Sequence, residues 1–253
     1  MTSTYDDYKL LASEQSKLAP KDWSFKSNKI YTRILEHTTV SQGNLYLKYI
    51  FKEFSDIYLK NKDMIINLIY TNDKYGKTNK YKYPSFIQCN PSNLRYIYQS
   101  FKILSYMNKL QISSTNIIEI GGGYGGLSFY LHNLSSIFNI NIKSYTIFDL
   151  DGPNKLTKAY LSNHNINTNN YTLDNFNNLN ENSFLISSYA FSELPKNIRD
   201  EYEEKILDKY ISHGFLAWNA VDYYKIKKNI NYTLLDTFYS IELNGKQHKY
   251  YIF

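Results

Sequence analysis

The chain has 253 residues, enough for one large domain, or one domain with a modest extension, and for a sizeable buried core. Its formal net charge of +6 comes from scattered basic residues rather than from runs of like charge, so we expect a basic surface and no nucleic-acid groove. Cys89 is the only cysteine, which excludes an internal disulfide and a thiolate metal cluster.

The N-terminal segment MTSTYDDYKLLASE carries acidic residues and no long apolar stretch, so no signal peptide is expected. No window approaches the roughly 20 apolar residues that span a bilayer. We therefore expect a soluble, cytoplasmic protein without a membrane partner. Free use of Asn, Lys, Ile and Tyr indicates an AT-rich genome, such as that of a low-GC bacterium or a large DNA virus.

The first part of the chain is expected to be mostly helical. In 44–61 (NLYLKYIFKEFSDIYLKN) apolar residues recur at helical spacing, and 91–110 repeats the pattern, with Ser92 as N-cap or Pro91 in the first turn. Between these segments, 71–84 is polar and ends in proline, so a loop is expected there.

From residue 115 onward, short apolar runs alternate with amphipathic segments. The predicted strands are 116–120, 143–150, 183–191 and 214–220, and the predicted helices are 125–138, 152–164 and 194–211. This alternation is typical of a parallel sheet covered by helices. Near the end, 234–243 and 246–253 flank Asn244-Gly245, a strong signal for an antiparallel hairpin. The sequence thus predicts an α/β fold whose mostly parallel sheet closes with an antiparallel hairpin.

The stretch NIIEIGGGYGG (116–126) places five of the ten glycines within six residues, directly after a predicted strand. Gly121, Gly123 and Gly126 fit G-x-G-x-x-G, the dinucleotide motif. Glu119 with Gly121, Gly123 and Gly125 fits E-x-G-x-G-x-G, the first motif of S-adenosylmethionine-dependent methyltransferases. The glycines alone do not discriminate, because both cofactors need a tight turn and a close backbone approach.

Glu119 favours S-adenosyl-L-methionine as the cofactor. A carboxylate close to the helix start would repel the pyrophosphate of a dinucleotide, whereas S-adenosyl-L-methionine carries a cationic ammonium and a cationic sulfonium. A turn without any ligand is the alternative, but it would not need so many glycines. The predicted cofactor-binding residues in this segment are Glu119, Gly121, Gly122, Gly123, Tyr124 and Gly125.

Further acidic residues are expected after the next strands. Asp149 ends the second predicted strand and is assigned to the ribose hydroxyls, although it follows the first motif glycine by 149 − 121 = 28 residues rather than about 20. Asp151 competes for this role, and an aspartate after a strand is also a common helix cap. Asp174 is assigned to the adenine amino group. Leu150 and Ser188, both near strand ends, complete the predicted cofactor set.

From residue 116 onward the chain resembles the Rossmann-like class of S-adenosylmethionine-dependent methyltransferases, through EIGGGYGG, YTIFDLDGPNKLTKAYL, ISSYAFSEL and GFLAWN. More narrowly, SYAFSEL and the upstream segment YTRILEHTTVSQGNLYL (31–47) resemble the sugar O-methyltransferase group. This resemblance implies a class I methyltransferase sheet in 111–253 and a helical substrate cap in 1–110. It also implies that the methyl acceptor is a hydroxyl of a sugar, as a nucleotide sugar or a glycan.

Two methyltransferase motifs are not evident. The Asn-Pro-Pro-aromatic motif of enzymes that methylate base amines is absent at the end of the predicted strand 183–191, where the chain reads SSYAFSEL. The Lys-Asp-Lys-Glu set of many ribose 2′-O-methyltransferases is not evident at the strand ends. Both observations count against a nucleic-acid acceptor.

Methyl transfer to an alcohol needs a general base, because a sugar hydroxyl does not ionise at neutral pH. His37, within LEHTTV in the helical cap, is the first candidate, and a surface or structural histidine is the alternative. Glu193, just past the predicted strand 183–191, is the second candidate, as base or as acceptor of a sugar hydroxyl. Its alternative is a helix-start carboxylate stabilised by the helix dipole.

Tyr189, Arg95 and Asn219 are the predicted substrate-binding residues, and each has ordinary core or rim packing as its alternative. An aromatic ring stacks on a sugar face, and Arg95 suits the phosphate of a nucleotide sugar. No metal site is predicted. The functional alternatives are a methyltransferase acting on RNA or a small natural product, an NAD-dependent oxidoreductase, and a degenerate fold that serves as a binding subunit. A homo-oligomer is also left open.

Overall fold

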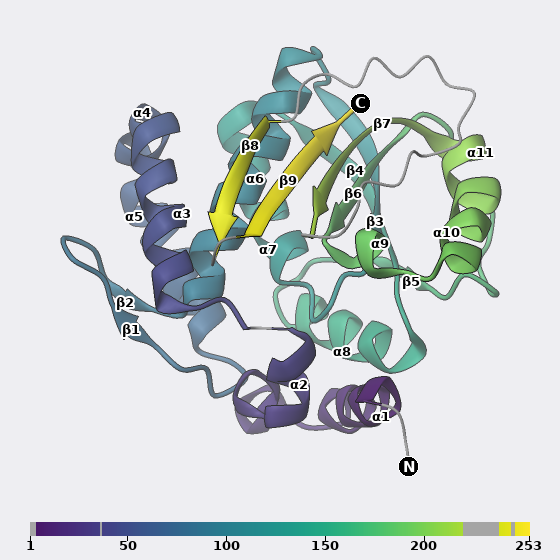
Figure 1. Ribbon diagram of the computed structural model, residues 1–253, viewed down its shortest axis with the longest axis horizontal. Coiled ribbons are helices and arrows are strands. Elements are labelled where there is room, and N and C mark those ends of the chain that lie inside the picture. The colour runs from purple at the N-terminus through teal and green to yellow at the C-terminus, as the bar shows by residue number, and fades with distance from the viewer. Residues whose placement is uncertain (1–3, 36, 220–237, 244–245) are drawn as a thin grey trace. The chain divides into compact units, whose positions relative to one another are not determined.

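The computed structural model describes residues 4–35, 37–219, 238–243 and 246–253, with the backbone alone described at 238–243 and 246–248 (Figure 1). These residues form two compact units. Unit 1 comprises Met1–Ser113, Gly123–Asn141 and Asp151–Asn167, and unit 2 comprises Ser114–Gly122, Ile142–Leu150 and Thr168–Phe253. The sequence places a boundary near residue 110, whereas unit 1 also takes in two later segments.

Unit 1 is mostly helical, as the sequence predicts. Its α-helices are α1 (Thr4–Ser16), α2 (Lys29–Ile34), α3 (Val40–Glu53), α4 (Ser55–Lys60), α5 (Lys62–Asp73), α6 (Pro91–Lys109), α7 (Gly126–Leu134) and α8 (Asp151–Ser162). Short 3-10 helices are η1 (Pro20–Asp22), η2 (Phe25–Ser27) and η3 (Ser135–Phe138). Strand β1 (Tyr81–Lys82) lies within the segment 71–84 that the sequence predicts as a loop, and it pairs antiparallel with β2 (Gln88–Cys89), which follows that segment.

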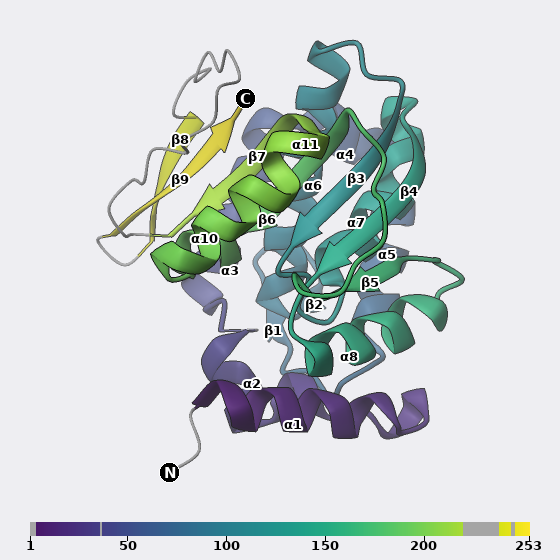
Figure 2. The same cartoon turned by 90° about the vertical axis from the view of Figure 1, so that its right-hand side faces the viewer.

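Capping residues explain where the unit 1 helices begin. Thr39 and Gln42 form a capping box at α3, so this helix starts earlier than the predicted residue 44. Asn90, rather than Ser92, caps α6 by accepting from the Ser92 backbone N–H, with Pro91 in the first turn as predicted. Helices α1 and α8 lie side by side (Figures 1 and 2).

Unit 2 contains the sheet. Its strands are β3 (Ser114–Ile120), β4 (Asn141–Phe148), β5 (Asn169–Tyr171), β6 (Ser183–Ser188), β7 (Ile211–Trp218), β8 (Phe238–Leu243) and β9 (Lys246–Ile252). Helices α9 (Ala190–Glu193), α10 (Lys196–Tyr202) and α11 (Asp208–Tyr210) follow β6, and a π-helical turn, η4 (Glu203–Leu207), interrupts the predicted helix 194–211.

The strand order β5-β4-β3-β6-β7-β9-β8 defines the fold. Parallel pairs join β3 to β6, β4 to β5 and β6 to β7, whereas β9 runs antiparallel to both β7 and β8. This confirms the predicted fold class, a Rossmann-like class I methyltransferase sheet that closes with an antiparallel pair. The predicted turn at Asn244-Gly245 lies outside the described residues.

An apolar layer fixes one face of this sheet. Ile118, Ile120 and Leu185 from the central strands are buried with Tyr202 and Ile206 from α10 and η4. Figure 2 shows α10 and α11 lying along that face. Since successive side chains of a strand point to opposite faces, Glu119 points to the other face.

The order of the strands shows at which edge of the sheet a ligand is expected to bind. Because β4 and β5 lie on one side of β3 while β6 and β7 lie on the other, the winding direction reverses between β3 and β6. In such sheets ligands bind outside the carboxyl ends of the strands at this reversal. None of the described helices combines the length and the apolar composition that a membrane crossing needs.

Candidate cofactor site at the carboxyl ends of the strands

The glycine segment after β3 uses left-handed backbone at three positions. Gly121, Gly123 and Gly125 have φ of +79°, +62° and +95°, whereas Gly122 and Gly126 are not among the residues with positive φ. A side chain in the left-handed region costs roughly 1–2 kcal/mol. Positive φ therefore occurs at all three glycines of E-x-G-x-G-x-G. Gly126, the last glycine of G-x-G-x-x-G, is required for a different reason, because a Cβ there would lie 2.6 Å from the Tyr96 and Tyr124 side chains, so the backbone fits both motifs.

Gly121 also lies where no side chain fits. Its N–H donates to the carbonyl of Phe148 at 2.8 Å, and a Cβ at Gly121 would lie 2.1 Å from the Cβ of Ala190. The start of the turn is thus held between the end of β4 and the start of α9, all within unit 2.

Glu119 is a buried carboxylate near the end of β3, with 1% of its surface exposed. The hydroxyl of Tyr145 on β4 donates to its Oε2 at 2.9 Å. A buried charge requires hydrogen-bonding partners, and this hydroxyl supplies one of them. The sequence predicts Glu119 but not Tyr145, whose role depends on the register between two strands.

Asp149 and Leu150 follow β4 directly. The half-buried Asp149 is tied to the strand end by its N–H, which donates to the Tyr171 carbonyl at 3.2 Å, and its Oδ1 accepts from the Leu150 N–H at 2.7 Å. Leu150 is exposed. Asp149 therefore has a fixed position at the carboxyl edge of the sheet, and its assignment to the ribose hydroxyls stays a prediction.

Two further aspartates lie at a helix start and in a turn. Asp151 opens α8 and forms an exposed ion pair with Lys155 one turn later, at 2.6 Å. Asp174 is exposed in the turn closed by the bridge between Thr172 and Asn175, immediately after β5. Asp174 thus follows the next strand of the sheet, as the sequence predicts, and its assignment to adenine stays a prediction.

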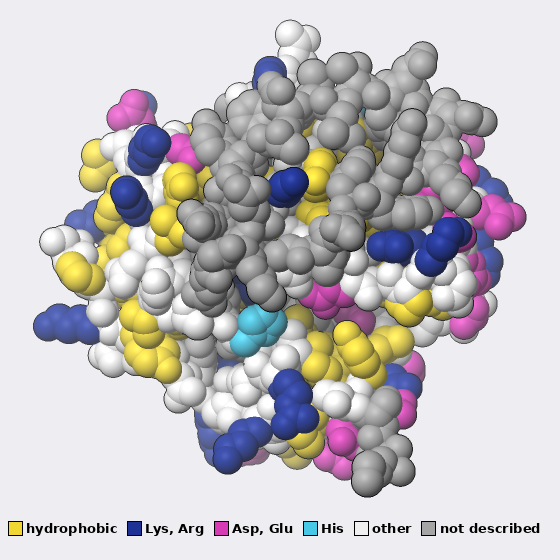
Figure 3. Space-filling view, viewed as in Figure 1, with side chains coloured by type: hydrophobic (Ala, Val, Ile, Leu, Met, Phe, Trp, Pro, Cys, Tyr) yellow, Lys and Arg dark blue, Asp and Glu magenta, His cyan; other side chains and the backbone are white. Residues whose placement is uncertain are grey.

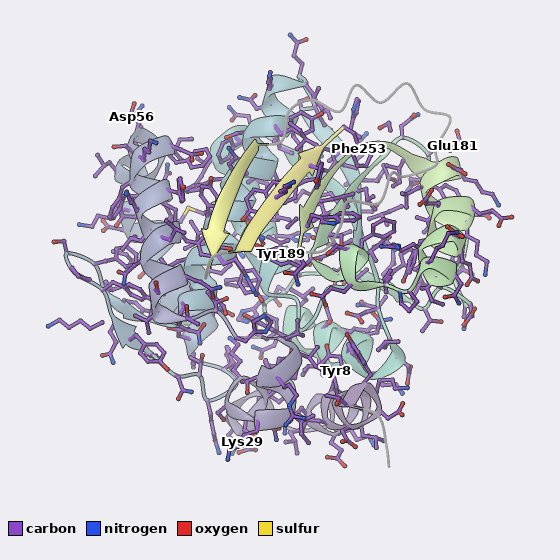
Figure 4. The ribbon with its side chains drawn as sticks, viewed as in Figure 1. Tyr8, Lys29, Asp56, Glu181, Tyr189 and Phe253 are labelled. Carbon is purple, nitrogen blue, oxygen red and sulfur yellow. The ribbon has the colours of Figure 1, made fainter. Side chains whose placement is uncertain are left out.

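The corner between β6 and α9 is strongly hydrogen-bonded. The buried Ser187 Oγ donates to the Ile120 carbonyl at 2.8 Å and accepts from the Phe191 N–H at 3.0 Å. Ser188 is half-buried at the end of β6. Tyr189 has a φ of +73° and donates its N–H to the Ala217 carbonyl at 2.8 Å (Figure 4). This corner joins β3, β6 and β7 at their carboxyl ends.

The structure brings together Glu193 and Asn219, which lie far apart in the sequence. The Asn219 Nδ2 donates to the Glu193 carboxylate. Ser192 Oγ accepts from the Asn219 N–H at 3.1 Å and lies 2.6 Å from the Tyr189 carbonyl, to which it donates. Ser192, which the sequence does not single out, therefore links Tyr189 to Asn219, and the Asn219 side chain in turn binds Glu193.

The other predicted residues belong to unit 1. His37 is exposed just before α3. Arg95 is only 9% exposed on α6, with its guanidinium carbon 5.0 Å from the Tyr96 ring centre. Tyr124 is 1% exposed and its side chain is buried in the core of unit 1, so contact with a cofactor would fall to its backbone. Roles for His37 and Arg95 on the substrate side stay predictions.

Acidic, histidine and cysteine side chains do not form a group of three or more that could hold a metal ion within the described part of the chain. The described groups at the strand ends are carboxylates, hydroxyls and backbone amides. These residue types bind cationic groups and sugar hydroxyls.

No protein-family model matches this chain, and neither does any curated protein. Solved structures with similar folds include a candidate sarcosine dimethylglycine methyltransferase from Galdieria sulphuraria, at 18% identity and a TM-score of 0.40, over 55% of this chain and 52% of the other. A candidate S-adenosyl-L-methionine-dependent methyltransferase from Methanococcus maripaludis has 18% identity and a TM-score of 0.37, over 49% of this chain and 54% of the other.

A candidate RNA methyltransferase from Pyrococcus horikoshii has 16% identity and a TM-score of 0.39, over 64% of this chain and 74% of the other. The matched part spans about half the length of the first two structures. All three are described as methyltransferases, and none of the three descriptions names a sugar acceptor. The residues of this chain must therefore carry the functional argument.

Proposed function

We propose that this protein is an S-adenosylmethionine-dependent O-methyltransferase that transfers a methyl group to a hydroxyl of a sugar, presented as a nucleotide sugar or within a glycan. The observation that carries the cofactor assignment is Glu119, a buried carboxylate two residues before the first left-handed glycine. A buried anion at this position favours a cationic ligand and disfavours the pyrophosphate of a dinucleotide.

The strand ends supply the remaining cofactor contacts. Asp149 accepts hydrogen bonds from the ribose hydroxyls, and Asp174 accepts one from the adenine amino group. Ser188 and Leu150 border the same edge. Backbone amides of Gly121–Gly125 meet the cofactor's carboxylate, since glycines allow the closest approach. When bound, S-adenosylmethionine supplies the electrophilic methyl group.

The acceptor side depends on Glu193. Its carboxylate is held by Asn219, whose backbone is in turn held by Ser192. Glu193 would accept the proton of the sugar hydroxyl, with Tyr189 beside it as a sugar-stacking ring, and the bound cofactor would supply the methyl group and leave as S-adenosylhomocysteine. His37 is the alternative base. The sugar class rests on the resemblance of SYAFSEL and of 31–47 to the sugar O-methyltransferase group.

Titration calorimetry with S-adenosylhomocysteine and with NAD tests the cofactor assignment. We expect micromolar binding of S-adenosylhomocysteine and none of NAD. Glu119→Gln, which removes the charge and keeps the shape, is expected to weaken binding at least tenfold, because a hydrogen bond to a charged group contributes about 1.5–3 kcal/mol. Binding of NAD alone would overturn the assignment in favour of an oxidoreductase.

A panel of nucleotide sugars, with radiolabelled methyl donor, tests the acceptor. We expect transfer to at least one nucleotide sugar, with Glu193→Gln reducing turnover while leaving the affinity for S-adenosylhomocysteine unchanged. The same panel with His37→Ala decides between the two bases, because only the residue that accepts the proton is needed for turnover. Transfer to RNA or to a small natural product, and to no sugar, would refute the sugar acceptor and keep the cofactor assignment.

A further inference from the structure

A buried polar cluster in unit 1 is centred on the side chain of Asn72, in the last turn of α5. Its Nδ2 lies 2.5 Å from the Asn93 Oδ1 and 3.1 Å from the Tyr124 hydroxyl. Its Oδ1 lies 3.0 Å from the Lys26 Nζ and 2.5 Å from the Tyr160 hydroxyl. A side-chain amide offers two N–H donors and one oxygen with two lone pairs, so these four partners use its full capacity.

The limited number of donors and lone pairs on the Asn72 amide determines which group donates in its hydrogen bond with the Tyr124 hydroxyl. The Tyr124 hydroxyl also lies 3.2 Å from the Asn72 Oδ1, but Lys26 and Tyr160 already donate to that oxygen. The hydroxyl of Tyr124 therefore accepts from Nδ2. With only 1% of its surface exposed, Asn72 is buried and fully hydrogen-bonded.

The cluster holds a buried positive charge. Lys26 is 2% exposed, and its Nζ donates to the Asn72 carbonyl at 2.7 Å and lies 4.5 Å from the centre of the Tyr124 ring. At the other end, Asn93 Nδ2 donates to Asp73 Oδ1 at 2.8 Å. Burying an ammonium group is costly unless it is hydrogen-bonded and close to negative charge or aromatic rings. Asn72 and Tyr124 supply these contacts.

Tyr124 connects this cluster to the glycine segment. It stands between Gly123 and Gly125, both with positive φ, and its side chain is buried in the cluster. The Gly123 carbonyl is held separately by the Thr157 Oγ1 of α8, at 2.7 Å. A segment with so many glycines loses much conformational entropy when it is ordered, at roughly 1–2 kcal/mol per residue for the backbone. An anchor in its middle removes part of that cost before a ligand binds.

We propose that Asn72 and Lys26 are positioning residues for the cofactor: they hold the Tyr124 side chain and thereby keep the glycine segment in its left-handed, binding-ready conformation. This inference rests on the proposed function. It goes beyond the predicted role of Tyr124, because the side chain acts from inside unit 1 and the neighbouring backbone meets the ligand.

Tyr124→Phe and Tyr160→Phe form a matched pair for the test. Each variant keeps its ring and removes one hydroxyl that bonds to the Asn72 amide, but only Tyr124 belongs to the glycine segment. Calorimetry with S-adenosylhomocysteine should show a loss of about three- to tenfold for Tyr124→Phe, equivalent to one neutral hydrogen bond, and less than twofold for Tyr160→Phe. Lys26→Met should resemble Tyr124→Phe.

Amide hydrogen exchange of residues 121–126 in the ligand-free protein is the second readout. We expect faster exchange in Tyr124→Phe than in Tyr160→Phe, at matched thermal stability. Equal losses of affinity in both tyrosine variants, or unchanged affinity in Tyr124→Phe, would overturn the proposal. If the wild-type protein does not bind S-adenosylhomocysteine, the proposed function fails, and the exchange rates still decide the anchor: faster exchange in Tyr124→Phe alone supports it, and equal rates overturn it.

Discussion

Single hydroxyls determine how the candidate cofactor site is held. Glu119 is buried and receives a hydrogen bond from Tyr145 on the neighbouring strand. Ser187 and Ser192 carry the hydrogen bonds of the corner that joins β6 to α9. The sequence singles out none of these three hydroxyls as a site residue. Each hydroxyl can be removed by a single substitution that keeps the rest of the side chain in place, so its contribution to binding or stability can be measured separately.

Tyr145→Phe should weaken binding of S-adenosylhomocysteine by roughly tenfold, because Glu119 loses a charge-assisted hydrogen bond of about 1.5 kcal/mol while the ring stays in place. Calorimetry measures the loss. Tyr210→Phe, on α11 of the same unit, is the control and should bind normally. Unchanged affinity in Tyr145→Phe would show that this hydroxyl does not support the Glu119 carboxylate in binding.

Burial lowers the pKa of His164 to about 4, with a smaller contribution from the Lys26 ammonium. The unfolded chain then takes up a proton near the ordinary pKa of 6.5, while the folded protein does not, so stability falls as the pH drops from about 6.5 to 4. His164→Phe should flatten this part of a urea-denaturation series. Burial also lowers the pKa of His132, so a His132→Phe variant shows how much of the remaining slope that residue carries.

At the scale of elements, the four-residue helix α9 fixes the geometry of the strand ends. It follows β6 through Tyr189, whose positive φ turns the chain sharply. Gly121 packs against its Ala190, and the Asn219 side chain at the end of β7 binds its Glu193. Such a short helix has no stability of its own, so these tertiary contacts determine where Glu193 stands.

Ser187→Ala should therefore destabilise unit 2 by about 1–3 kcal/mol, because the Ile120 carbonyl and the Phe191 N–H both lose a buried partner. Chemical denaturation measures this loss. Ser212→Ala, at a half-buried position on β7, is the matched control and should change stability by less than about 0.5 kcal/mol. A loss in Ser187→Ala no larger than in the control would contradict the account of this corner.

At the scale of the whole molecule, the surface charge bears on the class of acceptor. The net charge of +6 is the difference between 29 basic and 23 acidic residues. On the face in Figure 3, the described Lys and Arg side chains stand in small separate groups among apolar and polar residues. A nucleic-acid groove needs basic side chains that follow a continuous path of phosphates.

The scattered basic residues of the sequence predict that binding of a short RNA is weak and vanishes as salt is raised beyond physiological ionic strength, because few phosphates are neutralised at once. Fluorescence anisotropy with labelled RNA between low and high salt measures this. A nucleotide-sugar substrate carries only a few charges, so methyl transfer to it should depend far less on salt. RNA association that persists in high salt would favour the RNA alternative over the sugar acceptor.

The sequence by itself determined the local features. Short apolar runs and helical spacing predicted most strands and helices, and Asn244-Gly245 indicated the final antiparallel pair, whose strands the structure describes. The glycine spacing predicted a tight turn, where the structure has left-handed backbone at three glycines, and Asp149 was predicted as a ribose ligand because it directly ends a strand. These features depend on neighbours within a few residues, which is the range over which backbone preference and amphipathic patterning act.

Only the tertiary structure decided which side chains meet. Tyr145 lies 26 residues from Glu119, Asn219 lies 26 from Glu193, and Asn72 lies 52 from Tyr124. Strand register, the turn at Tyr189 and the packing of helices set these pairings, and no local pattern encodes them. The sequence predicted Tyr124 as a cofactor residue from its place between glycines. The structure shows its side chain buried against Asn72 and Lys26. A buried amide and a buried ammonium require hydrogen-bonding and aromatic partners, and Tyr124 supplies both.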